Sequence, residues 1–268
     1  MIPRPLAYGI GLTIVTASSV LADLVQYNDS PLSYPAVTAA LTAEYGVNPV
    51  TETAFSYYTV NGAGPATLNM RFKADTGGFF FNFGAYKVTP ALLAIDTSTD
   101  AGKIAYATQA LAAGNAALVF DDNTQDPGAS ASLTMIGAST IMGGDTLGFF
   151  LIPNNTLNEF QTNQGSFGLN TLNPTSARWP FFGLADANPG GLDQLMSFDG
   201  TSVVTGNPTS LFAWEDLTRL PGAGSDQNFN DLTFTVEGVT AAPIPEPATL
   251  GFGIALLAAV GASRSRRK

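Results

Sequence analysis

The sequence contains no histidine and no cysteine. Without histidine, Ser-His-Asp and Cys-His catalysis, the two-histidine metalloprotease motif and histidine-based zinc sites are all excluded. Without cysteine, no disulfide can stabilise the chain, so its stability has to come from core packing, with or without a bound metal. Any catalytic chemistry would have to use carboxylates, lysine or tyrosine.

Basic residues are also scarce. The 268 residues include 11 Lys and Arg against 21 Asp and Glu. Because one basic residue is Arg4 and four lie in the last five positions, residues 23–242 keep six basic residues against 20 acidic ones, a net charge of −14. This charge disfavours nucleic acid and anionic lipid surfaces as partners and leaves cations, basic proteins and neutral sugars.

The N-terminal segment predicts export. Residues 1–22 contain Arg4, an apolar stretch over 6–15 and small or moderate residues up to Ala22. These features are typical of a secretory signal peptide, with cleavage expected after Ala22.

The C-terminal segment 243–268 consists of Pro-Ile-Pro-Glu-Pro, an uncharged apolar run over 248–262 and a basic end. Such a run forms about 22 Å of helix, shorter than the ~30 Å hydrocarbon core, so its length alone also fits a buried core helix. The flanking prolines and the cluster of cations favour a membrane-inserted sorting helix instead.

These three parts resemble the PEP-CTERM sorting tail, found on exported proteins of Gram-negative bacteria that make exopolysaccharide. Pro245, Glu246 and Pro247 match its motif, and Ile244 stands where valine is commoner. The resemblance implies that an exosortase, a membrane protease-transpeptidase, recognises the tail as a substrate and removes the helix near Pro-Glu-Pro. It also implies export across the inner membrane to the cell surface or extracellular matrix. The helix would anchor the protein there transiently or stably, and exopolysaccharide is a candidate partner.

Residues 23–242 predict a mainly β body of β-sandwich or jelly-roll type with one or two short helices. Gly, Thr, Asn and aromatic residues suit short strands joined by turns. In one strand, Leu232, Phe234 and Val236 are expected to face the core, and Thr233, Thr235 and Glu237 to face outward. The predicted strands are 55–60, 67–73, 79–83, 117–120, 132–136, 146–152, 211–214 and 232–236.

Two helices are expected in the first half. One contains Val37, Leu41 and Tyr45 at four-residue spacing. The other contains Ile104, Ala107 and Leu111 after Asp100, which is placed to cap its N-terminus. Apolar stripes of this kind normally pack on a core.

Six oxygen-bearing side chains gather within 17 residues of the second half, interrupted by glycine turns. They are Glu215, Asp216, Asp226, Asn228, Asn230 and Asp231. Oxygen ligands on a flexible loop suit calcium, and a divalent cation relieves the repulsion among crowded carboxylates. The alternative is that these residues cap local turns. For the acidic segment 121–128 the two possibilities are a solvated loop and a cation site.

The spacing of Asp226, Asn228, Asn230 and Glu237 imitates an EF-hand loop. Asp231, however, stands where that loop needs glycine, and the following residues alternate like a strand. We therefore expect a calcium site of other geometry, or turn caps.

The second half also resembles the domain of unknown function 4114, which occurs on secreted and surface proteins of bacteria. The matching pieces are 147–154, 191–198, 212–217 and 228–232, which together span about 139–239. The resemblance implies a β-sandwich-like domain with no established reaction. Such domains often show Asp-His where this chain has Asp193-Gln194.

The predicted organisation is a signal peptide (1–22), an unassigned β-rich region (23–138), a β-sandwich-like domain (139–240) and the sorting tail (243–268). We expect a non-enzymatic structural or adhesive protein, with calcium as the candidate cofactor. One alternative is a carboxylate-pair glycoside hydrolase that uses Glu215 with Asp226 or Asp193. The other is a membrane-anchored glycan-binding module that stacks sugars on aromatic residues, whose alternative fate is burial in the core. These aromatic residues are Tyr57, Tyr58, Trp179, Phe181, Phe182 and Trp214.

Overall fold

The computed structural model describes residues 35–46, 52–53, 56–169, 179–225 and 228–242. The expected cleavage position at Ala22 and the motif Pro245-Glu246-Pro247 lie outside these residues, as does Asp226. Within the described part of the chain, no helix combines the length and the apolar character needed to cross a membrane.

The protein is mainly β and is built on two antiparallel sheets, as predicted. The first sheet contains β1 (Tyr57–Val60), β3 (Phe81–Lys87), β4 (Ala116–Asp121), β8 (Thr146–Pro153), β9 (Phe181–Phe182) and β13 (Val239–Ala242). The second contains β2 (Leu68–Asp75), β5 (Ser130–Leu133), β10 (Leu195–Thr201), β11 (Pro208–Trp214) and β12 (Leu232–Glu237). A short separate hairpin is formed by β6 (Met135–Ile136) and β7 (Ser139–Thr140).

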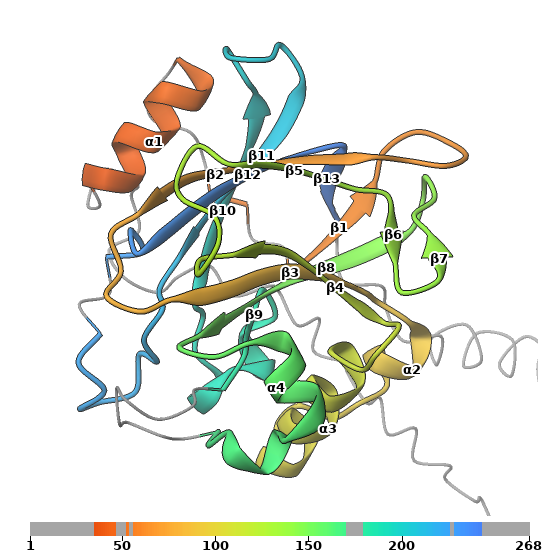
Figure 1. Cartoon of the computed structure of the whole chain (residues 1–268), viewed down its shortest axis with the longest axis vertical. Helices are drawn as coiled ribbons and strands as arrows, with labels where there is room; N and C mark the ends of the chain where they lie inside the picture. The colour runs from red at the N-terminus through yellow and green to blue at the C-terminus, as the bar shows by residue number, and fades with distance from the viewer. Residues whose placement is uncertain (1–34, 47–51, 54–55, 170–178, 226–227, 243–268) are drawn as a thin grey trace, which may run out of the picture.

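The strand order mixes the two halves of the sequence. The first sheet runs β13-β1-β8-β3-β4, with β9 paired to β8, and the second runs β10-β11-β12-β2-β5. Each sheet therefore combines strands from before and after residue 139, and the two sheets lie face to face (Figure 1).

The main core lies between the sheets. Leu232, Phe234 and Val236 of β12 point into it, as predicted, because alternate residues of a strand share a face. Phe234 stacks on Phe83 of the opposite sheet, with 4.1 Å between the ring centroids. Residues from both halves of the chain thus form one hydrophobic core.

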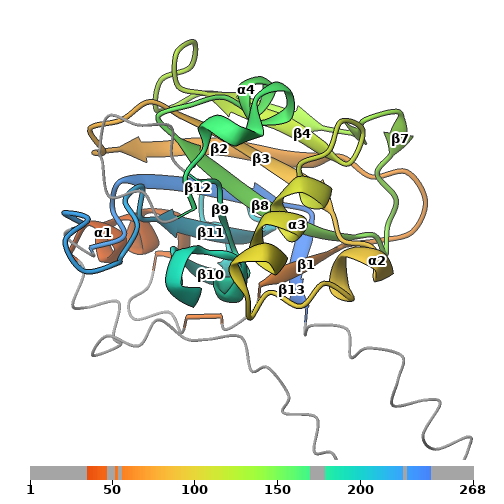
Figure 2. The same cartoon turned by 90° about the horizontal axis from the view of Figure 1, so that it is seen from below.

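Helices cover the outer face of each sheet. The described residues form four α-helices rather than one or two: α1 (Pro35–Tyr45), α2 (Pro90–Leu93), α3 (Asp100–Ala110) and α4 (Leu157–Thr162). Helix α1 lies on the second sheet, and α2, α3 and α4 lie on the first (Figures 1 and 2). Strand β8 is consequently buried on both faces, which explains its continuous apolar sequence.

The helices correct three predictions from the sequence. Thr233 and Thr235, expected to face solvent, are only 3% and 1% exposed, because α1 packs over the same face of the second sheet. Ile104, expected in the packing stripe of α3, is 43% exposed. Thr99 rather than Asp100 caps that helix, since its hydroxyl accepts a hydrogen bond from the backbone N–H of Gly102.

A buried carboxylate holds α1 on the second sheet. Glu44 is fully buried, and its carboxylate oxygens lie 2.6 Å from Arg71 Nη2 and 3.0 Å from Lys73 Nζ. Burial acts to raise the pKa of Glu44, but hydrogen bonds from Ser202 and Lys73 and the charge of Arg71 outweigh burial, so this pKa lies below its usual value. The neighbouring Tyr45 hydroxyl, also buried, donates to backbone carbonyls of the second sheet.

Candidate cation site

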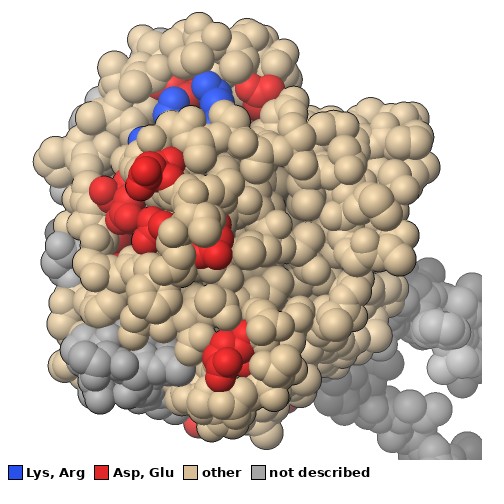
Figure 3. Space-filling view, in the orientation of Figure 1, with Lys and Arg blue, Asp and Glu red and all other residues tan. Residues whose placement is uncertain are grey.

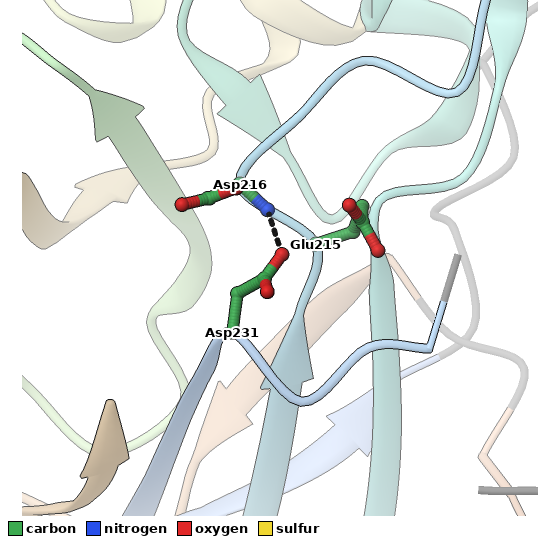
Figure 4. Close-up of side chains that lie close together, drawn as sticks. All are labelled: Glu215, Asp216 and Asp231. Atoms are coloured by element: carbon green, nitrogen blue, oxygen red, sulfur yellow. Dashed lines mark hydrogen bonds between the residues drawn. The ribbon is translucent and has the colours of Figure 1, made fainter. Parts of the chain in front are cut away.

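Three carboxylates meet at one end of the second sheet. The antiparallel pairing of β11 with β12 places Trp214 opposite Leu232, so the residues just beyond this pair are neighbours. These residues are Glu215, Asp216 and Asp231, and one carboxylate oxygen from each lies within 4.8 Å of the other two (Figure 4). Their exposed fractions are 1%, 3% and 9%, so the cluster is buried.

Backbone and side-chain hydrogen bonds fix the loop that carries Glu215 and Asp216. The backbone N–H of Asp216 donates to Asp231 Oδ2 at 3.0 Å (Figure 4). Gln194 accepts the N–H of Glu215 at its own carbonyl, and its side-chain amide donates to Leu217 O at 2.7 Å. Gln194 thus positions the loop after β11.

The loop after β2 closes the other side of the cluster. Its Gly77 N–H lies 2.9 Å from Asp75 Oδ1 and 3.2 Å from the carbonyl of Asp231. A Cβ atom at Gly77 would lie 2.7 Å from Asp216 Oδ2, closer than real Cβ contacts allow. A side chain at position 77 would therefore require the Asp216 carboxylate to move.

A second group of acidic residues continues from this cluster. Burial raises the pKa of Asp75 to about 6, and the nearby carboxylates of Asp122 and Asp231 add to the shift. The pKa of Asp122 is also raised, first by burial and then by the charges of Asp126 and Asp121. Figure 3 shows acidic side chains gathered together on this face of the molecule. The segment 121–128 is therefore not an isolated loop, since it brings Asp122 next to Asp75.

The structure brings three of the six predicted ligands together and gives others local roles. Asn228 accepts the backbone N–H of Asn230 at 3.0 Å, which is a turn-capping contact of the kind proposed as the alternative. Glu237 lies within β12, where it accepts from Asn207 and pairs with Arg71 at 3.8 Å. Glu237, the twelfth position of the EF-hand spacing, is the last residue of strand β12.

Asp75 and Gly77 were not predicted from the sequence as part of this site. The available signal was local: an acidic residue at the end of a predicted strand, followed by Thr-Gly-Gly. Its significance depends on β2 pairing with β12, which places Asp75 opposite Leu232, next to Asp231. Nothing in the sequence near Asp75 specifies that pairing.

The aromatic residues considered for sugar stacking are buried. Trp179 is 3% exposed, Trp214 is fully buried, and Tyr57 and Tyr58 are each 1% exposed. Phe181 and Phe182 of β9 are buried as well. Burial, the alternative fate, is thus confirmed, and these side chains offer a sugar no stacking surface.

The donor set of the cluster is made of carboxylate oxygens. Hard oxygen ligands suit Ca²⁺, which takes six to eight of them in flexible geometry, better than metals that prefer nitrogen or sulfur. Like charges this close also disfavour the ionised state unless a cation offsets them. Glu215, Asp216 and Asp231 are therefore the residues that could hold a divalent cation, with Asp75 beside them.

The comparisons with known proteins bear on the second half of the chain. No curated protein and no solved structure gives a significant match. Residues 141–239, which include the three clustered carboxylates, match the family described as Domain of unknown function (DUF4114), and this match confirms the resemblance predicted for the second half.

Proposed function

We propose that this chain is a non-enzymatic structural or adhesive protein of the cell surface or extracellular matrix, whose β-sandwich is ordered by calcium at Glu215, Asp216 and Asp231. The observation that carries the proposal is the meeting of three buried carboxylates within 4.8 Å at the ends of two strands. A divalent cation bound there joins the end of β11 to the start of β12, and offsets the repulsion among the carboxylates.

Export supports this role. The signal peptide and the sorting tail both direct the chain out of the cytoplasm. An exosortase in the membrane then takes the tail as its substrate. An exported protein without cysteine has no disulfides, and a bound metal serves the same purpose of limiting local unfolding. The net charge of −14 over residues 23–242 favours cations and neutral exopolysaccharide over anionic partners.

Burial argues against the glycosidase alternative. A glycoside hydrolase places both carboxyl groups against the bound sugar. Glu215 and Asp193 are only 1% and 8% exposed, and Asp193 accepts the backbone N–H of Leu195 as a turn cap. The glycan-binding alternative loses its main support for a similar reason, because its aromatic residues lie in the cores.

The test is thermal unfolding of residues 23–242, titrated with calcium and repeated with magnesium and with chelator. A ligand that binds only the folded state adds about 2.7 kcal/mol at a hundredfold excess over its dissociation constant. For a protein of this size the expected increase in Tm is roughly 5–10 °C. Magnesium should give less, since it requires strict octahedral geometry.

Matched variants separate a specific site from general screening of negative charge. Asp231→Asn and Asp216→Asn should lose the calcium shift, while Glu159→Gln, which removes a carboxylate from α4, should keep it. Equal shifts in all three variants, or no shift in the unmodified protein, would refute the calcium site.

A further inference from the structure

One flank of this acidic protein carries almost no charge. Residues 104–120 and 128–144 contain no Asp, Glu, Lys or Arg. They supply β4, β5 and the β6–β7 hairpin, which lie beside one another. In Figure 3 the part of the surface over β6 and β7 is free of charged side chains, whereas the acidic residues gather on the opposite side.

Large apolar side chains are exposed on this flank. In β6, Ile136 is fully buried and Met135 is 46% exposed; just after β7, Ile141 is fully buried and Met142 is 39% exposed. Leu118 on the adjacent β4 is 41% exposed. Leu118, Met135 and Met142 are thus three of the seven large hydrophobic side chains that are exposed among the described residues, and apolar side chains that gather on one surface mark interaction sites.

The flank also contains an open edge of each sheet. Among the described strands, β4 ends the first sheet and β5 ends the second, so each pairs there with a single neighbour, β3 and β2 respectively. Edge strands direct unpaired N–H and C=O groups outward, and proteins usually protect them with charged side chains or proline. Neither type occurs in β5, and β4 has no charge before Asp121.

We propose that this flank, defined by Leu118, Met135, Met142 and the edges of β4 and β5, binds a second copy of this chain. Two bodies that each carry −14 repel one another in most orientations, and an uncharged flank lets identical copies approach closely. A two-fold axis through the flank would bring the same apolar side chains of both copies together. This proposal goes beyond the surface or matrix role and does not depend on calcium.

The border of the flank is consistent with this occupant. Lys87 Nζ lies 3.2 Å from Asp145 Oδ2, and also donates to the carbonyl of Thr140 in β7. The two charges neutralise each other, so they add no net charge where the copies would meet. A basic partner protein would instead be attracted to the acidic face that carries Asp75 and Asp122.

The absence of cysteine allows a direct test in the full chain. Met135→Cys introduces a single thiol on the flank, and Val203→Cys introduces one at the tip of the β10–β11 hairpin, where Val203 is 63% exposed. Both proteins are oxidised in detergent micelles and separated on a non-reducing gel. We expect at least tenfold more disulfide-linked dimer from Met135→Cys, although its site is the less exposed one. Equal yields would overturn the proposal, because random collision favours Val203→Cys.

A second measurement keeps the test independent of cysteine placement. Sedimentation equilibrium of the full chain in density-matched detergent should show a dimer in the micromolar range. Leu118→Glu should weaken the dimer at least tenfold by placing like charges in the interface, whereas Val203→Glu should leave it unchanged. A monomeric unmodified protein, or an equal loss in both variants, would overturn the proposal. Removal of calcium should not change the dimer, so failure here is distinguishable from failure of the cation site.

Discussion

Replacing Glu44 with glutamine is expected to destabilise the protein by about 2–3 kcal/mol at neutral pH. Removing one partner of a buried ion pair costs about 3–5 kcal/mol, because the other charge is left buried. Here the side chains of Arg71 and Lys73 are 20% and 24% exposed, so water compensates their charges in part. The expected cost therefore lies at or just below the lower end of that range. Arg71 also keeps Glu237 at 3.8 Å.

Urea denaturation of the Glu44→Gln variant measures this loss, and Tm should fall by roughly 4–12 °C. The control is Lys87→Gln, which breaks an ion pair with Asp145 in which both partners are partly exposed, and it should cost no more than about 1 kcal/mol. Because the pKa of Glu44 is lowered in the folded state, its contribution is present above the usual glutamate pKa and is lost as the pH falls through the folded-state value. The two proteins should therefore converge in acid. Equal losses in the variant and its control would show that the cost of burying Glu44 cancels its attraction to the two cations.

Two further predictions concern a glycine contact and the pH dependence. Gly148→Ala should cost about 1–3 kcal/mol in urea denaturation, because the new Cβ overlaps the ring of Tyr86, whereas Gly165→Ala meets no atom and should change stability by less than about 0.5 kcal/mol. Equal costs would contradict this. Asp75 has a pKa raised to about 6 when folded, so in chelator the stability of the unmodified protein relative to Asp75→Asn should fall as the pH rises from about 4 to 6. If the difference in free energy of unfolding between the two proteins does not depend on pH, the raised pKa of Asp75 is contradicted.

Periodicity in the sequence predicted the mainly β fold and most of the strands. The alternation of Leu232, Phe234 and Val236 reflects a local rule, since alternate side chains of a strand face the same side. Strand β10 was not predicted, because Met196, Ser197 and Phe198 are all buried and so show no alternation. Its outer face lies under α1, where Phe198 packs, and this cover is a long-range contact.

The cation site could be predicted only where its residues are close in sequence. Glu215, Asp216 and Asp231 were identified together because they fall within one short segment. Asp75 was not, because it reaches the site through the pairing of β2 with β12, some 160 residues away along the chain. The sequence also left open whether the first half folds separately, and the strand order shows that both halves share the two sheets.

The position of β1 has a consequence for how the chain folds as it is synthesised from its N-terminus. β1 lies between β8 and β13, and it pairs along its whole length with β13, the last described strand. A chain that emerges from its N-terminus exposes Tyr57–Val60 long before residues 239–242 follow. Contacts of such large sequence separation slow folding. The first sheet is therefore completed only when nearly all of the body has emerged, and until then the edge of β1 that pairs with β13 is open to chaperones and to other chains.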